Sequence, residues 1–447
     1  MKEADLQSRD YIRRPCASHC ATAGLPHLTA LRGRVETVDG ETLTVVADGA
    51  HHAVRNTTQR DIRRGDIVEL AVGTDGVTAA FTHLLVRPSQ VTPPATRQGE
   101  ISSPRLREVL KARSTMITCV REFFLQRGFV EVPTPALVPS PGMESHLAGF
   151  STVYEDHRGS PHRVWLPTSP EFALKRALCA GLERIFEVKT VFRNHGEMGP
   201  LHYPEFTMLE WYRAFTDYRV IMEDAEELVS AIARCLQTDA QQEFRGVPIR
   251  WDPPYRRMSV SEAFSFYAGI DLVKGMGDED GFRSACEARL SRVPCDEDFS
   301  SLFHRVMMEL VEPNLGLSAP VILHDYPMAL AALAAQNRED TRFCERFELY
   351  VAGVELANAF TEVNDPREMA IRIKQARQEQ RARGVLPTPA DGGLLRAMRQ
   401  GMPPSGGIAV GMDRLLMAML GLDHIAEVLP FCLHDAVSLS QRLRTLR

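Results

Sequence analysis

The chain has 447 residues, of which 44% are hydrophobic and 25% charged, and its formal net charge at pH 7 is −6. This balance is typical of a soluble globular protein, and the length allows one large domain together with a small one. No apolar run is long enough to span a bilayer, and the N-terminal MKEADLQSRDYIRRP lacks the apolar core of a signal peptide. We therefore expect the cytoplasm as location, no membrane association and no general attraction to nucleic acid.

The nine cysteines are odd in number and scattered without a framework. Cys119 and Cys179 stand in apolar contexts, so we predict reduced cysteines of the core. Cys16 and Cys20 have no second ligand pair at a suitable spacing, which disfavours a zinc site.

Residues 1–29 are predicted to be an N-terminal extension, and residues 30–87 a small β module. Apolar and polar residues alternate there in short runs, separated by turn signals such as Asp39-Gly40 and Asp75-Gly76. Short strands at regular intervals favour a small barrel, such as one of the OB type. Another small β module fits the same pattern.

Residues 88–103 are predicted to be a linker, because the segment is rich in proline and polar residues. The rest of the chain, 104–447, mixes helices and strands as an α+β domain does. Its first helix is expected over Leu106–Arg127, where apolar residues recur at helical spacing, and Gly128 would end it.

The segment Phe129–Pro135 is a predicted strand that runs into prolines, which are tolerated at edges and ends of sheets. In Thr168-Ser-Pro-Glu, Ser169 is placed to cap a helix with Pro170 at its first position. Neither feature is catalytic on spacing alone.

A polar loop joins two strands around residues 185–212, in a predicted hairpin. On the second strand Phe206 and Glu210 share one face, and an aromatic ring beside a carboxylate can bind a flat ring and a cationic group. The alternative is a half-buried hairpin whose glutamate faces solvent.

Near the C-terminus, Glu355, Asn358 and Glu362 offer oxygen atoms that suit Mg²⁺ together with phosphate. A strand with two exposed acids is the alternative. Farther on, Gly406-Gly-Ile-Ala-Val-Gly-Met-Asp-Arg414 is a glycine-rich strand entering a helix, where Arg414 could clamp a phosphate.

Together these segments resemble the three signature motifs of class II aminoacyl-tRNA synthetases: the strand ending at Pro135, Phe192-Arg193 with Pro204-Glu205-Phe206, and Gly407–Arg414. Thr168-Ser-Pro-Glu indicates the lysine-specific branch of this class. MLEWYR, GVELAN and GIAVGMDR are most similar to the elongation factor P–(R)-β-lysine ligases, the GenX or PoxA proteins, which are paralogues of lysyl-tRNA synthetase. The resemblance covers about residues 104–435 and leaves out the β module. It implies an antiparallel sheet flanked by helices.

The resemblance also implies a reaction in two steps, with ATP and Mg²⁺ as cofactors. Lysine or (R)-β-lysine is activated as its adenylate, and the aminoacyl group then passes to a lysine side chain of elongation factor P. Positioning and charge neutralisation would carry the catalysis. A homodimer is implied as well.

Site residues follow from the motif match. The catalytic residues would be Arg193, on the α-phosphate and the substrate carboxylate, and Arg414, on the γ-phosphate. Expected ATP-binding residues are Arg193, His195, Glu197, Tyr203, Phe206, Glu355, Leu356, Gly411 and Arg414. Expected substrate-binding residues are Ser169, Glu171, Glu210, Tyr212, Asn358, Glu362 and Ala409. The expected metal ligands are Glu355 and Glu362.

Ala409 is the most discriminating position, because lysyl-tRNA synthetases are expected to have glycine there and the ligases alanine. One methyl group in a tight pocket is worth about 1–3 kcal/mol of discrimination, which favours (R)-β-lysine over α-lysine. Three departures from the family pattern concern nucleotide binding. In a loop that is one residue longer than usual, His195 stands where an acid is common. Tyr203 replaces an asparagine, and Ala359 replaces a glycine. We expect Glu197 to supply the missing acid.

Two other functions fit the sequence. A lysyl-tRNA synthetase would use the β module to read the anticodon, but among residues 30–87 Phe81 is the only aromatic and acids balance the arginines. A catalytically inactive paralogue is disfavoured because Arg193, Glu355, Glu362 and Arg414 are retained.

Overall fold

The structure is a computed structural model, and it describes residues 29–47, 50–56, 61–72, 78–86, 104–143, 147–194, 196, 199–238, 242–384 and 387–431. The chain divides into two compact units, Met1–Glu100 and Ile101–Arg447. Apart from Thr29, the predicted extension 1–29 and linker 88–103 lie outside the described residues.

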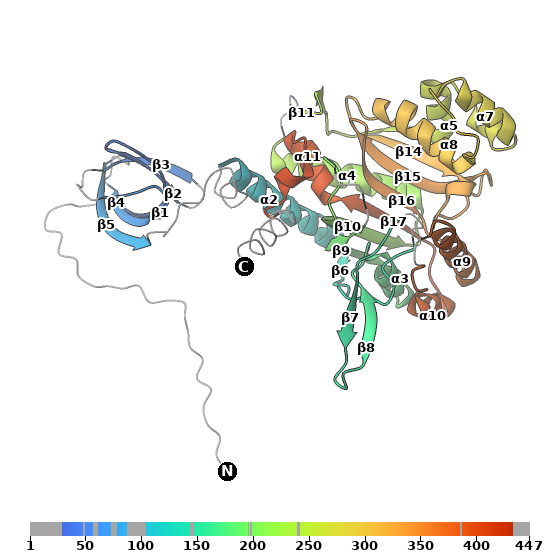
Figure 1. Ribbon diagram of the computed structural model, residues 1–447, viewed down its shortest axis with the longest axis horizontal. Coiled ribbons are helices and arrows are strands. Elements are labelled where there is room, and N and C mark those ends of the chain that lie inside the picture. The colour runs from blue at the N-terminus through green and yellow to red at the C-terminus, as the bar shows by residue number, and fades with distance from the viewer. Residues whose placement is uncertain are drawn as a thin grey trace, which may run out of the picture. The chain divides into compact units, whose positions relative to one another are not determined.

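The first unit is a closed barrel with strand order β1-β2-β3-β5-β4 (Figure 1). Its strands are β1 (Thr29–Asp39), β2 (Thr42–Ala47), β3 (Ala50–Asn56), β4 (Ile67–Val72) and β5 (Thr78–Val86). Alternate residues point inward, so that Val35, Leu43, Val54 and Leu70 form its core. Gly40 has a φ of +56° at the tight turn between β1 and β2, where the sequence predicted it. A small barrel is thus confirmed.

The second unit is built on one sheet of order β13-β14-β15-β16-β17-β10-β9-β6 (Figure 1). The strands are β6 (Val130–Glu131), β9 (Arg184–Phe192), β10 (Glu205–Ala214), β13 (Arg256–Ser259), β14 (Val321–Pro327), β15 (Phe343–Val351), β16 (Val354–Thr361) and β17 (Ser405–Gly411). All neighbours are antiparallel except the two edge pairs, β13 with β14 and β6 with β9. The strand that runs into prolines is therefore an edge strand, and the predicted α+β sheet is confirmed.

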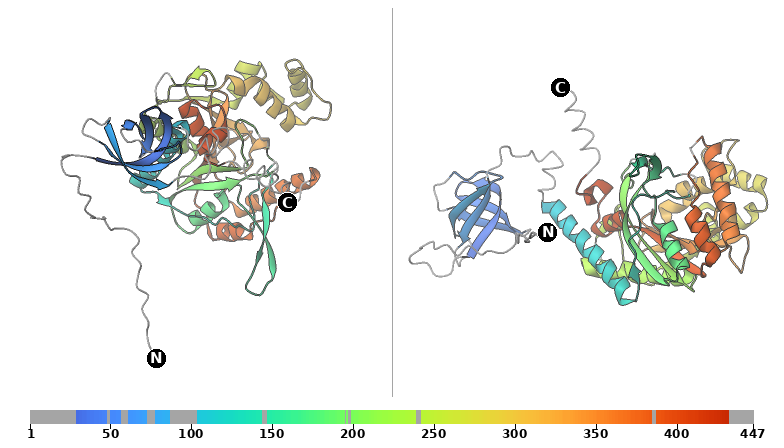
Figure 2. Two further views of the ribbon diagram at one scale, coloured as in Figure 1. Left: turned by 60° about the vertical axis from the view of Figure 1, so that its left-hand side comes forward. Right: turned by 90° about the horizontal axis from the view of Figure 1, so that it is seen from below.

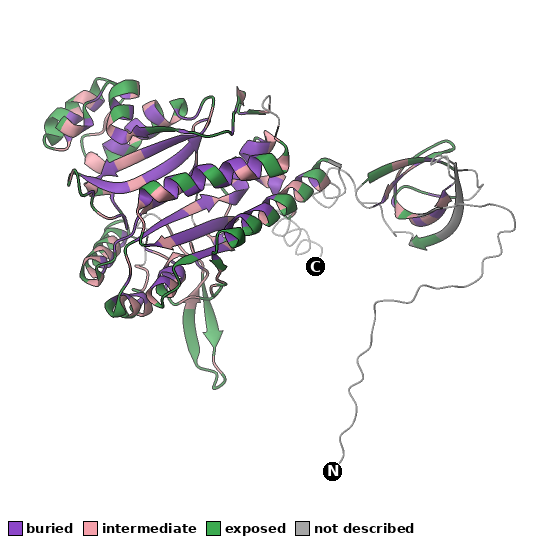
Figure 3. Ribbon diagram, turned by 180° about the vertical axis from the view of Figure 1, so that it is seen from behind, coloured by how far each residue is buried: buried purple, intermediate pink, exposed green. Residues whose placement is uncertain are grey.

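Three helices pack against one face of this sheet: α2 (Pro104–Gln126), α4 (Tyr218–Leu236) and α11 (Met412–Leu420). Figure 3 shows buried residues concentrated on the sheet and on the sides of the helices that face it. Phe124, Phe186 and Trp211 are almost completely buried there, and this apolar core leaves the opposite sheet face open for polar groups.

The remaining helices form two further cores beside the sheet. One contains α3 (Glu171–Cys179), α9 (Pro366–Ala382) and α10 (Gly392–Gln400). The other contains α5 (Val260–Ala263), α6 (Leu272–Gly275), α7 (Glu279–Glu287) and α8 (Phe299–Val306), next to β13, β14 and β15. Short π and 3₁₀ segments are η1 (Phe264–Ala268), η2 (Met307–Val311), η3 (Glu312–Asn314), η4 (Met328–Leu330) and η5 (Ile425–Val428).

Two small hairpins complete the unit. One pairs β7 (Ser151–Glu155) with β8 (Pro161–Trp165) and projects from the domain (Figure 2), and the other pairs β11 (Glu243–Phe244) with β12 (Val247–Pro248). Among the described helices, none has the length and apolar character needed to cross a bilayer.

Candidate active site

The site lies on the open face of the sheet, and β10 shows how the sequence creates it. Side chains alternate along the strand, so Leu209 and Trp211 enter the helix-covered core while Glu210 and Tyr212 point to the other face. Glu210 is only 1% exposed. The alternative of a solvent-facing glutamate is therefore excluded.

Arg193 follows β9 directly and lies over Phe206. Its backbone N–H donates to the Pro204 carbonyl at 2.9 Å, which closes the hairpin, and its guanidinium carbon lies 5.1 Å from the Phe206 ring centroid. The Nε atom of Arg193 is buried and finds no hydrogen-bond acceptor within the described part of the chain. A buried donor without an acceptor is suited to an anionic ligand.

Arg414 lies in the first turn of α11 and is held by two backbone carbonyls. Its Nη1 donates to the Glu355 carbonyl at 2.8 Å and its Nε to the Leu201 carbonyl at 3.1 Å, while Nη2 is 2.8 Å from His202 Nε2. Burial, together with the nearby Arg193, lowers the pKa of Arg414. Two partly dehydrated guanidinium groups that repel each other favour an anion such as phosphate between them.

Glu355 reaches the same region because of a β-bulge. Tyr350 of β15 is paired with Glu355 and Leu349 with Ala357, so Leu356 is the extra residue. The bulge turns Glu355 toward the open face while the Leu356 side chain enters the core. Burial, and next the carboxylate of Glu348, raises the pKa of Glu355 to about 7.

Glu348 of β15 was missed by the sequence analysis. It accepts hydrogen bonds from the hydroxyls of Tyr326 and Tyr350, both at 2.6 Å, and from Arg346 Nη2 at 2.5 Å. Arg346 Nε in turn donates to Asn358 Oδ1 at 3.1 Å. Glu348 precedes Glu355 by seven residues, the same spacing that separates Glu355 from Glu362, and this repeat was the available signal.

The two predicted metal ligands, Glu355 and Glu362, lie beside different partners. Glu355 neighbours Glu348, and Glu362 is paired with a lysine instead. The nearby Glu348 carboxylate contributes to the raised pKa of Glu355, and two neighbouring carboxylates are suited to a divalent cation. Within the described residues no group of three or more His, Cys, Asp or Glu side chains could hold a metal, and Mg²⁺ commonly takes one or two carboxylates plus phosphate oxygens. Binding of Mg²⁺ itself stays a prediction.

Ser169, Glu210 and Tyr212 form a hydrogen-bonded group farther along the same sheet face. The Ser169 hydroxyl donates to Glu210 Oε1 at 2.6 Å and the Tyr212 hydroxyl to Glu210 Oε2 at 2.9 Å. Burial, followed by the Glu210 carboxylate, raises the pKa of Tyr212 well above its usual value, so Tyr212 remains a donor.

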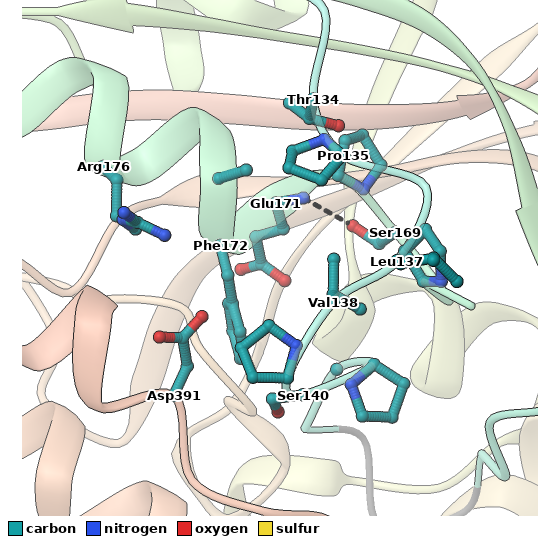
Figure 4. A pocket seen from close by; sticks show the side chains of 16 residues that line it. Thr134, Pro135, Leu137, Val138, Ser140, Ser169, Glu171, Phe172, Arg176 and Asp391 are labelled. Carbon is teal, nitrogen blue, oxygen red and sulfur yellow. Dashed lines mark hydrogen bonds between the residues drawn. The ribbon is translucent and has the colours of Figure 1, made fainter. Parts of the chain in front are cut away.

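The start of α3 differs by one residue from the sequence prediction. Pro170, not Ser169, is the N-cap residue, and the helix begins at Glu171. Ser169 Oγ still accepts the Glu171 backbone N–H at 2.9 Å, as Figure 4 shows. A cavity of about 70 Å³ lies beside this turn, lined by residues that include Thr134, Pro135, Ser140, Ser169, Glu171 and Asp391.

Lys175 is the second functional candidate that the sequence analysis missed. Its buried Nζ lies 2.5 Å from Glu171 Oε1 and 2.5 Å from Glu362 Oε2. Burial opposes its charge, but the two carboxylates outweigh burial and raise the pKa of Lys175. Burial raises the pKa of Glu362 to about 8 although Lys175 acts against it, because one ammonium group serves two acids.

Small residues on β17 keep the space above these acids free. Gly407 faces Glu362 and Tyr212 so closely that a Cβ atom would collide with both. Two residues on, Ala409 shares that face and is paired with Glu210 of β10 and Asn358 of β16. The Ala409 methyl group therefore lies on the floor of the site, between Glu210 and Asn358.

The remaining residues that were predicted to bind ATP lie in different surroundings. Tyr203 packs against the main core, and the Leu356 side chain lies inside it, so only the backbone of Leu356 could meet a nucleotide. Gly411 is the N-cap residue of α11. His195 and Glu197 lie outside the described residues.

The fold and the site define a class of protein: an antiparallel sheet presents two arginines and paired carboxylates at one end and a group of acids at the other. The model of one protein family, tRNA synthetases class II (D, K and N), matches residues 91–435. The chain belongs to this family. Membership supports amino acid activation by an ATP-dependent ligase, in a family that generally uses ATP and Mg²⁺.

Proposed function

We propose that the protein activates lysine or (R)-β-lysine with ATP and transfers it to a lysine side chain of elongation factor P. The observation that carries the proposal is the charge of the acidic end of the site. Glu171, Glu210 and Glu362 supply three negative charges when ionised and Lys175 supplies one positive charge. The remaining two negative charges match the two ammonium groups of a diamino acid.

The acids Glu171, Glu210 and Glu362 would contact the two amines of the substrate. Glu210, held by Ser169 and Tyr212, would accept one ammonium group, and Glu171 or Glu362 would balance the other. Arrival of a cation lowers the pKa of a nearby carboxyl, so Glu362 would ionise as the substrate binds. The Ala409 methyl group would favour the β-amino isomer, whose amine is displaced by one carbon.

ATP would occupy the opposite end. Arg193 would neutralise the α-phosphate and the attacking carboxylate, Phe206 would stack on adenine, and Arg414 would bind the γ-phosphate. Glu355 and Glu348 would hold Mg²⁺, which neutralises charge on the phosphates and the leaving pyrophosphate. No residue need act as a nucleophile, because the substrate carboxylate attacks and catalysis rests on positioning and charge.

We propose elongation factor P as acceptor and a homodimer as the working form. Transfer to lysine tRNA is the second candidate, which the N-terminal barrel favours because OB-like barrels bind single-stranded nucleic acid.

One experiment distinguishes these functions. The purified full-length protein is incubated with ATP, Mg²⁺ and labelled α-lysine or (R)-β-lysine, with elongation factor P and lysine tRNA offered separately. Label on the protein acceptor supports the proposal, and label on tRNA alone supports a synthetase. Absence of amino acid-dependent pyrophosphate exchange would leave an inactive paralogue.

A further inference from the structure

Two cysteines that are distant in the sequence meet between helices α2 and α4. The Sγ atom of Cys235 lies 2.7 Å from the Sγ atom of Cys119. A disulfide bond is about 2.05 Å long, so a bond requires the two sulfurs to approach by less than about 1 Å. Both cysteines are free thiols in the structure.

The two thiols differ in their access to solvent. Cys235 lies in the last turn of α4 and is exposed, while Cys119 is 7% exposed and packs into the main core of the domain. Burial, followed by the hydrogen bond from Cys235, raises the pKa of Cys119 to about 12. Cys235 is therefore the thiol that a reagent in solution meets first, and Cys119 is in position to react second.

We propose that Cys119 and Cys235 form a reversible disulfide when the protein meets hydrogen peroxide. The Cys235 sulfur attacks one peroxide oxygen, the O–O bond breaks, and a sulfenic acid and water result. The Cys119 sulfur then attacks Cys235 Sγ. The S–S bond forms as the S–O bond breaks, and hydroxide leaves as water with the proton of Cys119. The two thiols lose two electrons and two protons, and peroxide becomes two waters.

The bond would fix a helix that supports the candidate active site. Arg113, on α2 six residues before Cys119, lies 2.5 Å from Asp413 Oδ1 and donates at 2.5 Å to Thr207 Oγ1. Asp413 also accepts the Thr207 backbone N–H at 2.6 Å. In the sequence, Asp413 directly precedes Arg414, and Thr207 directly follows Phe206. Oxidation would therefore secure α2 to α4 and stabilise the region that supports both residues.

The cross-link is tested on the full-length reduced protein. After removal of the reductant, hydrogen peroxide is added at one equivalent, remaining thiols are alkylated, and tryptic peptides are analysed by mass spectrometry. Each cysteine lies in a separate tryptic peptide, residues 114–121 and 235–245. We expect these two peptides joined with the loss of two hydrogens, and separate again after treatment with a dithiol reductant.

A second measurement tests the effect on the fold. Because the bond closes a loop of about 116 residues in the unfolded chain, the midpoint of thermal unfolding should rise by about 5 °C on oxidation. Cys235→Ala should abolish both the joined peptide and this rise. Cys295→Ala removes another exposed thiol and should leave both unchanged. The proposal is overturned if peroxide leaves Cys119 free for alkylation while Cys235 is oxidised further, or if the cross-link forms and the midpoint does not rise.

Discussion

Lys175 Nζ lies 2.5 Å from Glu362 Oε2, and both side chains are completely buried. The same ammonium group lies 2.5 Å from Glu171 at the start of α3. One cation thus joins the first turn of α3 to the end of β16. Burying this lysine and its carboxylates is unfavourable for folding unless the charges are paired.

Lys175→Met should strongly destabilise the protein, because the completely buried Glu362 and the partly buried Glu171 lose their shared counter-ion. We expect the free energy of unfolding, measured with urea, to fall by about 3–5 kcal/mol. The double variant Lys175→Met/Glu362→Gln removes one of the stranded acids and should recover part of the loss. Lys111→Met breaks the exposed pair with Glu108 and should change stability by less than about 1 kcal/mol. A similar small loss for Lys175→Met would refute a charged pair.

The raised pKa of Glu355 predicts a dependence of stability on pH. A glutamate titrates near 4.3 in an unfolded chain, whereas burial and the Glu348 carboxylate raise the pKa of Glu355 in the folded protein to about 7. The folded state therefore holds the proton more tightly. The stability that the protonated Glu355 contributes to the folded state is fully present below about pH 4.3 and is lost as pH rises through about 7.

Glu355→Gln removes this titration. The difference in unfolding midpoint between the variant and the wild type should shift in favour of the variant as pH rises from 5 to 8. Glu345→Gln is a suitable control, because this buried glutamate lies on the opposite face of the adjacent strand. A difference that stays constant between pH 5 and 8 for Glu355→Gln would contradict the assigned pKa.

Gly407 is predicted to be essential for substrate binding for a steric reason. A Cβ atom at this position would collide with Glu362 and Tyr212, and overpacking of this kind costs about 1–3 kcal/mol. Gly407→Ala should therefore lower kcat/KM for the amino acid in pyrophosphate exchange by about 10-fold or more, mainly through the KM of the amino acid. Gly277→Ala is a matched control away from the site, since its Cβ would lie 3.8 Å from the Lys274 carbonyl. Equal losses in both variants would argue against the steric account.

Much of the site follows from local patterns in the sequence. The two-residue period of a strand is sufficient to place Phe206 and Glu210 on one face. Arg193 follows the end of β9, and Arg414 lies in the first turn of α11. Both positions could be predicted, because sequence signals mark the boundaries of strands and helices. The four-residue spacing of Glu171 and Lys175 is also a helical signal, although nothing local shows that their charges are buried.

The remaining features depend on which strands become neighbours. Glu348 and Glu355 meet because β15 and β16 pair with a bulge at Leu356, and neither the pairing nor the bulge can be read from a single strand. The sequence analysis grouped Glu355 with Glu362 from their spacing along the chain. Lys175 reaches Glu362 across some 187 positions of sequence, so only the assembled sheet brings these charges together.

Ala409 provides the sharpest test of substrate choice. Its methyl group lies between Glu210 and Asn358, and one methyl group in a tight pocket changes discrimination by about 1–3 kcal/mol. Ala409→Gly should therefore shift the ratio of kcat/KM for α-lysine over (R)-β-lysine by about 10- to 200-fold toward α-lysine. Ile408→Val alters the adjacent residue, whose side chain faces the core, and should reduce stability without changing the ratio. If Ala409→Gly leaves the ratio unchanged as well, the discrimination must reside elsewhere in the site.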